Sequence, residues 1–240
     1  MPNHYFQFKK FIVHQEKCSM KVCTDSCMFG AWIANTIDEK KINPKNILDI
    51  GTGTGLLSLM LAQKLNTQTD AVEIDKSAFE QAKENFDASP WDERLQAFHS
   101  DIKNWKVPHK YDLIICNPPF YENDLLPEDE GKNISKHNSA LHLEKLLFIV
   151  KDLLKEDGNF AVMLPWHRTN WFENAAAVYS LFVTNKMEVK QTPVHNYFRT
   201  MFILQKKKTV IQKSELTIKN NNNGYTGEFI ELMKDYYLYL

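Results

Sequence analysis

The sequence predicts an α/β protein with a doubly wound, mostly parallel sheet, and two observations support that prediction. Short apolar runs, NILDI at 46–50 and TDAVEI at 69–74, have the length and composition of buried strands. A helical pattern follows each run, GLLSLMLAQKL at 55–65 and SAFEQAKENF at 77–86. Strands that alternate with helices form parallel sheets with helices on both faces. We therefore expect crossover connections from about position 46 onward.

The alternation continues through the second half of the chain. Three further expected strands are RLQAFHS (94–100), YDLIIC (111–116) and GNFAVML (158–164). Before the last of them, ALHLEKLLFIVKDLL (140–154) predicts an amphipathic helix that ends near Gly158. Only a short connection separates 183–194 from 200–208, which favours antiparallel pairing at one end of the sheet. We therefore expect a seven-stranded sheet with an antiparallel edge strand.

The flanking segments complete a single expected domain, residues 1–240. Thr24 or Asp25 is suited to cap a helix through 26–37, within a basic N-terminal segment at 1–45. At the other end, KNNNNG predicts a turn before a last segment at 226–237.

Composition and charge exclude several classes of protein. A chain of 240 residues that is 43% hydrophobic can bury one substantial core. Its net charge of -1 provides no general attraction for nucleic acid, so such binding needs a local basic patch. The four cysteines lack paired Cys-x-x-Cys spacing, so we expect reduced thiols and no metal. No apolar run approaches the ~20 residues of a membrane span, and no signal peptide is evident, so we expect a cytoplasmic protein without a membrane partner.

Glycines and acids follow the first three expected strands. Gly51, Gly53 and Gly55 allow a tight turn whose N–H groups approach a ligand at the carboxyl end of the sheet. Glu73, at the end of the next strand, can accept hydrogen bonds from both ribose hydroxyls. Asp101, after the third strand, can accept the exocyclic amine of an adenine. Together they predict a nucleoside site, although each alone is compatible with a turn or a solvated acid.

The cofactor that best suits this site is S-adenosylmethionine. Nicotinamide dinucleotides favour G-x-G-x-x-G spacing, whereas these glycines run G-x-G-x-G directly after Asp49. A carboxylate at that turn repels a pyrophosphate and suits a cationic amino-acid group. The pattern resembles the first motif of class I S-adenosylmethionine-dependent methyltransferases over about 46–164, which implies their Rossmann-like fold.

The stretch YDLIICNPPF ends a buried strand with an amide, two prolines and an aromatic ring. The Asn117 side-chain oxygen and the Pro118 carbonyl can each accept one hydrogen of a planar NH2 group. The pair Pro118-Pro119 restricts the backbone that presents these acceptors, and Phe120 offers a face for stacking a flat substrate. Drawing both hydrogens toward fixed acceptors helps localise the nitrogen lone pair for attack on a methyl group.

The tetrapeptide NPPF resembles that of amino-methyltransferases acting on planar nitrogens in nucleic acids or glutamine side chains. This resemblance implies catalytic roles for Asn117, Pro118, Pro119 and Phe120. The tetrapeptide does not separate adenine N6, guanine N2 and glutamine N5.

The chain length and the stretch MKVCTDSCMFGAW (20–32) resemble the bacterial tRNA1(Val) adenine-N6 methyltransferases, which modify an adenine beside the anticodon. That family normally has KVGTD where this sequence has KVCTD, so Cys23 replaces a glycine. The resemblance implies that Thr24 and Asp25 lie over the methionine end of the cofactor, whereas the residues alone equally suit a helix cap. It also implies a tRNA partner, and we expect a monomer.

Four alternatives stay open. Release-factor glutamine methyltransferases carry a helical domain before a similar core, and only about 45 residues precede the first expected strand here. Ribosomal guanine-N2 methyltransferases with this tetrapeptide often carry a second copy of the domain, for which 240 residues leave no room. The intact NPPF disfavours a non-catalytic RNA-binding partner, and the glycine spacing disfavours a dehydrogenase.

Basic residues outside the motifs fit an RNA-binding role. The candidates for phosphate contacts are Lys9, Lys10, Lys17, Lys21, Arg168 and Arg199, with His167 and Lys206 to Lys208 as further possibilities. A solvated lysine face is the alternative for each of them. We also expect the segment 121–138 to be mobile until RNA binds, because it is long, charged and lacks an apolar period.

Overall fold

A computed structural model of the chain describes residues 3–119 and 131–240, with the side chains of 131–141 excepted. Phe120 and positions 121–130 of the segment expected to be mobile lie outside the described residues. Positions 131–138 belong to a helix, α4 (Gly131–Leu153).

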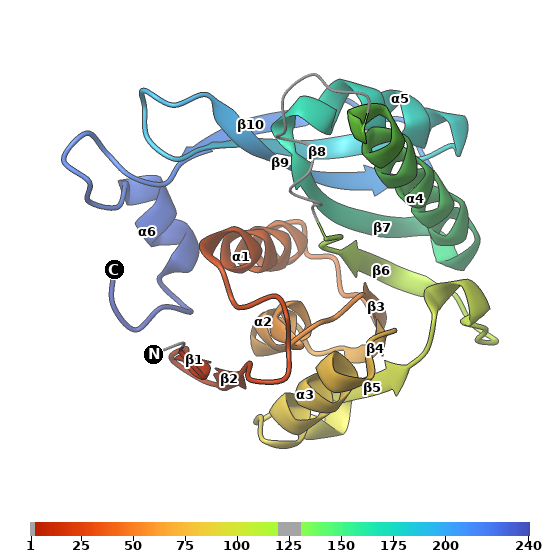
Figure 1. Ribbon diagram of the computed structural model, residues 1–240, viewed down its shortest axis with the longest axis horizontal. Coiled ribbons are helices and arrows are strands. Elements are labelled where there is room, and N and C mark those ends of the chain that lie inside the picture. Colours follow the sequence, from red (N-terminus) through yellow and green to blue (C-terminus); the bar gives the residue numbers. More distant parts are fainter. Residues whose placement is uncertain (1–2, 120–130) are drawn as a thin grey trace.

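One large mixed sheet forms the centre of the described structure (Figure 1). Its strands are β3 (Asn46–Ile50), β4 (Gln68–Glu73), β5 (Leu95–His99), β6 (Tyr111–Cys116), β7 (Leu154–Pro165), β8 (Phe182–Lys190), β9 (Tyr197–Gln205) and β10 (Gln212–Thr217). They lie in the order β10-β8-β9-β7-β6-β3-β4-β5. Within this sheet β9 pairs antiparallel with both neighbours and all other pairs are parallel. The doubly wound, mostly parallel fold expected from the sequence is therefore confirmed.

Two details of the expected sheet are wrong. Across residues 3–119 and 131–240 the sheet has eight strands and not seven, and the antiparallel strand β9 lies between β7 and β8 instead of at the edge. In β9 the run Thr200–Leu204 is buried throughout, and a strand buried on both faces needs a neighbour on each side. The edge is β10, in which only Leu216 is buried. Its polar sequence gave too weak an apolar pattern to be recognised as a strand.

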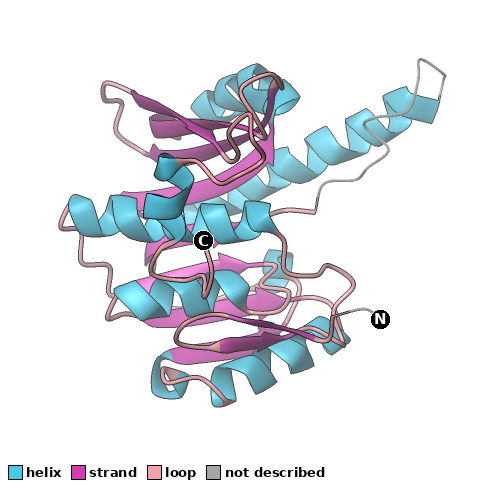
Figure 2. Ribbon diagram, turned by 90° about the vertical axis from the view of Figure 1, so that its left-hand side faces the viewer, coloured by secondary structure: helices cyan, strands magenta, loops and turns pink. Residues whose placement is uncertain are grey.

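Helices cover both faces of the sheet, as Figures 1 and 2 show. On one face lie α1 (Thr24–Glu39), α2 (Leu56–Lys64), α3 (Lys76–Asp87) and α6 (Gly227–Met233), which contribute to one apolar cluster. On the other face, α4 and α5 (Thr169–Val178) contribute to a second cluster. Short 3-10 turns, η1 (Asp92–Arg94), η2 (Ile102–Asn104) and η4 (Trp166–Arg168), follow strands or precede them. The core is thus two apolar layers separated by the sheet.

Helix α1 is part of this core although it precedes the first strand of the sheet. Eleven of its residues are buried, and a side chain at Gly30 would begin 2.7 Å from the Met60 sulfur of α2. The expectation that Thr24 or Asp25 caps it is wrong, because the N-cap position is Cys23, which makes no side-chain cap hydrogen bond. Asp25 lies within the first turn, after the N-cap position, and accepts a hydrogen bond from Arg199 Nε at 2.8 Å.

The two ends of the described chain meet. A hairpin of β1 (Tyr5–Gln7) and β2 (Ile12–His14) packs beside the C-terminal segment, where Phe8 bridges Tyr237 and Lys9 N donates to the Tyr236 carbonyl at 2.9 Å. Within the residues that the structure describes, we find no helix whose length and apolarity would let it cross a membrane.

Candidate active site

The carboxyl ends of four neighbouring parallel strands define the candidate site. Ile50 of β3 pairs in register with Val72 of β4 and Cys116 of β6, and Glu73 pairs with His99 of β5. The loops that leave these strands therefore begin at one edge of the sheet, which is where doubly wound proteins bind ligands.

The glycine turn follows β3 at this edge. Gly51, Gly53 and Gly55 all have positive φ, at 70°, 56° and 82°. No atom lies within 4 Å of a Cβ built at Gly51 or Gly53, whereas one built at Gly55 would lie 2.5 Å from the Phe86 ring. Gly55 is thus required by packing against α3. Gly51 and Gly53 leave the turn open on the side that a ligand would approach, which fits a bound nucleoside.

Asp49, two residues before Gly51, forms hydrogen bonds to the glycine turn and to α2. Its side chain is fully buried, and Oδ2 accepts hydrogen bonds from Thr52 Oγ1 and Ser58 Oγ, both at 2.7 Å. Oδ1 has no hydrogen-bond partner among the described residues. Burial raises the pKa of the Asp49 carboxyl to about 6, against the two hydroxyl hydrogen bonds that lower it. A cationic group above the turn would favour the ionised form of this carboxyl.

Glu73 joins the turn to the start of α3. Its Oε2 accepts from Gly53 N and its Oε1 from Asp75 N, both at 2.9 Å. Because a carboxylate has about four acceptor positions, two remain for the hydroxyls of a ribose. Asp101 lies one strand further along, where its Oδ1 accepts from Lys103 N at 3.0 Å.

Asn117 follows β6 directly, on the other side of the glycine turn. Its Nδ2 donates to Ser26 Oγ of α1 at 2.9 Å. Its Oδ1 is shielded from solvent and accepts no hydrogen bond from any described residue. A buried amide oxygen without a donor costs about 1–3 kcal/mol, so this position is suited to a ligand that supplies one.

Comparison with known proteins places these residues in a family. Residues 30–162 match the family described as Methyltransferase small domain. The chain is 40% identical to a tRNA1(Val) (adenine(37)-N6)-methyltransferase of Trichodesmium erythraeum, covering 99% of each chain. It is 41% identical to one of Dyadobacter fermentans, covering 98% of each. This chain belongs to the tRNA1(Val) (adenine(37)-N6)-methyltransferase family. The family predicted from the sequence is confirmed.

Solved structures share the fold at low sequence identity. A predicted O-methyltransferase of Agrobacterium tumefaciens superposes with a TM-score of 0.65 at 14% identity, covering 87% of this chain and 95% of that one. An S-adenosylmethionine-dependent methyltransferase of Clostridium acetobutylicum gives 0.56 at 15% identity, covering 77% and 92%. The class I methyltransferase fold is thereby confirmed.

In this member of the tRNA1(Val) methyltransferase family, Thr24 and Asp25 do not line the cavity at the glycine turn. That cavity lies between the glycine turn and the segment that leads into α1. Its walls are Met20, Lys21, Val22, Ser26, Gly51, Thr52, Gly53, Thr54, Leu56, Leu57 and Asn117. Thr24 and Asp25 line a separate hollow with Gln191, Thr192 and His195. Their expected position over the cofactor stays a prediction.

The expected phosphate contacts fall into two groups by position. Arg168 and Arg199 lie at the carboxyl edge, because η4 follows β7 and Arg199 pairs with Pro165. Lys206 follows the antiparallel strand β9 and donates to the Leu154 carbonyl at the start of β7, so it lies at the opposite edge. That position argues against Lys206 to Lys208 as a surface for RNA at the site.

Three of the four N-terminal lysines have partners within the chain. Lys9 and Lys21 donate to the carbonyls of Lys234 and Gln15, and Lys17 pairs with Glu84. Their expected contacts with RNA stay predictions.

Sequence reasoning missed the polar residues that hold the site together. Ser26 accepts a hydrogen bond from Asn117, and Ser58 donates one to Asp49. Asn85 Nδ2 donates to the Thr54 carbonyl in the glycine turn at 2.8 Å. A signal was available for Ser58, which is an isolated polar residue within the apolar run LLSLML at 56–61.

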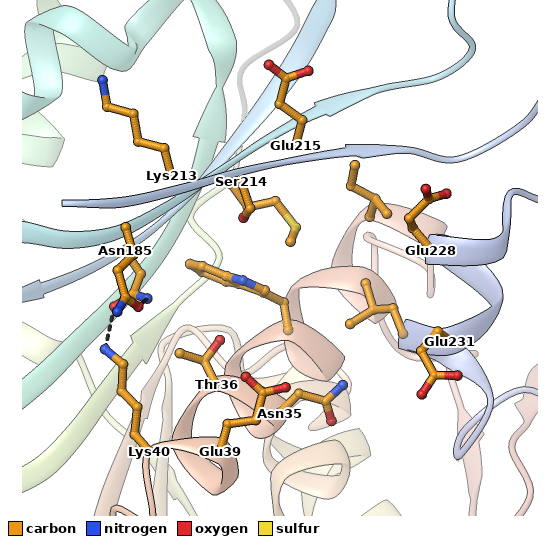
Figure 3. A pocket seen from close by; sticks show the side chains of 15 residues that line it. Asn35, Thr36, Glu39, Lys40, Asn185, Lys213, Ser214, Glu215, Glu228 and Glu231 are labelled. Carbon is orange, nitrogen blue, oxygen red and sulfur yellow. Dashed lines mark hydrogen bonds between the residues drawn. The ribbon is translucent and has the colours of Figure 1, made fainter.

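A second cavity, of about 730 Å³, lies between α1, β8, β10 and α6 (Figure 3). The Lys40 side chain crosses part of this cavity, where its Nζ donates a hydrogen bond to Asn185 Oδ1 at 2.6 Å. Glu39, Glu228 and Glu231 also line it, but none of the predicted site residues does. Among the described residues no group of three His, Cys, Asp or Glu is placed to bind a metal ion, in this cavity or elsewhere.

Proposed function

We propose that this protein methylates N6 of an adenine in tRNA, adenine 37 of tRNA1(Val), with S-adenosylmethionine as methyl donor. The observation that carries the proposal is Asn117 Oδ1, a buried acceptor without a described partner at the strand end beside the glycine turn. The names of relatives about 40% identical over the whole chain supply the identity of the RNA and of the base.

The residues present divide into a donor half and an acceptor half. The open glycine turn and the remaining acceptor positions of Glu73 would hold the nucleoside and amino-acid parts of the cofactor, and Asp101 is the proposed acceptor of its adenine amine. The bound cofactor supplies an electrophilic methyl group on a sulfonium. Asn117 Oδ1 accepts one hydrogen of the target amine, and the Pro118 carbonyl is the proposed acceptor of the other.

This arrangement requires no prior proton removal. The N6 lone pair would form the new N–C bond while the S–C bond of the methyl donor breaks. The electron pair of the S–C bond would stay on sulfur, which would leave the donor as a thioether. The methylated nitrogen then carries one proton too many, which passes to water. Two fixed acceptors hold the lone pair in line with the methyl group, which is catalysis by orientation and by preorganised dipoles.

We also propose that the protein acts as a single domain and as a monomer in the cytoplasm. A tRNA substrate is found in that compartment, and the strand ends that carry Gly51, Glu73 and Asn117 belong to one sheet. The lysines at 9, 10, 17 and 21 remain the proposed phosphate contacts. Replacing Lys9 and Lys10 with alanine is expected to weaken tRNA binding and to flatten its salt dependence, without changing S-adenosylmethionine affinity.

The direct test is nucleoside mass spectrometry on purified tRNA1(Val) transcript after incubation with the protein and S-adenosylmethionine. We expect N6-methyladenosine in the wild-type transcript and none in a transcript with guanine at position 37. Methylation of a protein glutamine or of guanine N2, with unmodified adenine 37, would contradict the proposal.

A further inference from the structure

The carboxamide of Asn117 has two chemically different ends, and only one suits the proposed reaction. Its oxygen accepts a hydrogen bond from an amine, whereas its NH2 group would meet the amine donor to donor. Half a turn of the amide exchanges the two ends with almost no change in shape. The reaction therefore needs a group that fixes the amide orientation.

Ser26 is placed to do this. It lies in the first turn of α1 and is only 6% exposed. Its Oγ accepts a hydrogen bond from Asn117 Nδ2 at 2.9 Å. Both side chains line the cavity that also contains Gly51 and Gly53. With Nδ2 bonded to Ser26, Oδ1 is the end left without a described partner.

The proton of Ser26 decides whether its oxygen can accept. If the Ser26 hydroxyl donated its proton to Asn117, the amide oxygen would have to face Ser26. The carboxamide would then have the opposite orientation, with its NH2 group toward the target amine. Cys23 Sγ lies 3.3 Å from Ser26 Oγ and offers this proton an alternative acceptor. With the proton on the sulfur side, Ser26 presents a lone pair to Nδ2.

We propose that Ser26 is a positioning residue for methyl transfer, whose hydroxyl holds the Asn117 carboxamide with Oδ1 facing the target amine. The inference rests on the proposed function and adds a residue that acts through Asn117 and not on the substrate.

A double-mutant cycle tests it. Ser26→Ala is expected to lower kcat on tRNA1(Val) transcript about threefold to tenfold, the effect of one net hydrogen bond, with little change in KM for RNA. Ser26→Thr, which keeps the hydroxyl, is expected to retain most of the activity. In an Asn117→Ala background, Ser26→Ala is expected to cause no further loss, because the group it orients is gone.

Thr36→Ala is the matched control, since it removes a hydroxyl from the far end of the same helix. The role of Ser26 would be overturned if Ser26→Ala lowered kcat by the same factor in the wild-type and Asn117→Ala backgrounds. It would also be overturned if Ser26→Ala left kcat unchanged. Either result would leave the proposed function in place. A wild-type protein that transfers no methyl to tRNA would instead overturn the proposed function.

A separate observation concerns two aromatic rings at the same edge. Trp166 stacks on Tyr197 with ring centroids 5.8 Å apart and planes at 28°, and Lys190 Nζ lies 4.3 Å from the Tyr197 centroid. A carboxylate holds the edge of the Trp166 ring, because Trp166 Nε1 donates to Glu188 at 2.9 Å. Trp166 nevertheless stays 41% exposed, so this is an aromatic surface fixed in orientation and open to solvent.

This surface lies at the same edge of the sheet as Asn117, and Trp166 comes three residues after Met163, the position of β7 that is level with Asn117. Cys116 pairs with Val162 of β7, Asn117 follows Cys116, and Trp166 is the first residue after β7. A base that enters the pocket must leave its stack, and its neighbours then need new stacking partners. An exposed tryptophan supplies one for any base.

We further propose that Trp166 stacks an unpaired base of the RNA next to the target adenine. Trp166→Ala is expected to raise KM for the transcript about fivefold or more, and Trp166→Phe to keep most of the affinity. Calorimetry is expected to show unchanged S-adenosylmethionine binding in both variants.

Phe148→Ala is the control, an exposed ring on α4 that contacts Tyr179 beyond the end of α5. An unchanged KM in Trp166→Ala, or an equal rise in Phe148→Ala, would contradict the stacking role. Neither result would affect the identity of the methylated base, which the transcript with guanine 37 tests separately.

Discussion

The two halves of the candidate site differ in how their polar groups are satisfied. Around the glycine turn, Glu73 and Asn85 form hydrogen bonds with backbone groups, and Asp49 accepts from two hydroxyls through Oδ2, although its Oδ1 has no described partner. Around Asn117, an acceptor has no described partner and a tryptophan is exposed. The first half is built before its ligand arrives, whereas the second is completed by its ligand. Loss of a side chain should therefore affect stability and cofactor binding in the first half, and turnover in the second.

The largest expected effect is on turnover, in the second half. Asn117→Ala is expected to lower kcat about 10²–10³-fold, by analogy with the loss of one preorganised hydrogen-bonding group at a reacting centre. S-adenosylmethionine affinity, measured by calorimetry, is expected to stay within about twofold of wild type, well below the tenfold that 1.4 kcal/mol would produce. A normal rate would remove the distinction between the halves.

A pair of glycine variants separates packing from binding within the first half. Gly55→Ala is expected to lower the free energy of unfolding by about 2–4 kcal/mol, because it strains the backbone at positive φ and meets Phe86. Gly53→Ala has open space around its Cβ and should cost only about 1–2 kcal/mol from backbone strain, but it should weaken S-adenosylmethionine binding. Chemical denaturation and calorimetry measure the two effects. Equal destabilisation by both variants would contradict the assignment of Gly53 to the ligand side.

Glu73→Ala is expected to weaken S-adenosylmethionine binding by about 1.5–3 kcal/mol per lost charge-assisted hydrogen bond. The same variant frees the Gly53 and Asp75 N–H groups, so a smaller loss of stability accompanies it. Calorimetry on wild type and variant provides the measurement. If neither protein bound S-adenosylmethionine or its demethylated product, the methyl-donor assignment would fail.

Asp49 gives the first half a pH dependence. Because burial raises its pKa from 3.8 to about 6, the folded state binds the proton more tightly than the unfolded state. The contribution of protonated Asp49 to the free energy of unfolding is fully present below about pH 4. It is lost as the pH rises through about 6, which lowers the free energy of unfolding by about 1–3 kcal/mol. Asp49→Asn should lack this loss when denaturation curves at pH 4 and pH 7 are compared. Identical pH profiles in the two proteins would show that Asp49 ionises normally.

The sequence predicted the elements whose pattern is local. Gly51, Gly53, Glu73 and Asn117 each end or follow a strand with a strong apolar pattern, so strand order alone brought them to one edge. The polar strand β10 was not predicted, because its stability comes from pairing with β8 and not from its own apolar face.

The contacts that hold the site were beyond prediction for a related reason. Ser26 reaches Asn117 across 91 positions, and Asn85 reaches Thr54 across 31. No periodicity records which distant side chain a buried amide will meet. The same holds for Asp25, which the pattern at the helix start offered as a cap and which Arg199 binds instead.

The meeting of the hairpin with Tyr236 and Tyr237 has a consequence for synthesis on the ribosome. Lys9 and Phe8 find their backbone partners about 228 residues later in the chain, whereas His14 of the same hairpin bonds Asn85 of α3. Strands β3 to β7 can pair while translation continues, since domains fold largely from the N-terminus as the chain emerges. The hairpin also leads into Gln15, whose side chain accepts from Val22 N beside the cavity at the glycine turn. A nascent chain can thus pair these strands before its first hairpin gains the C-terminal contacts, which form only after residue 237 has left the exit tunnel.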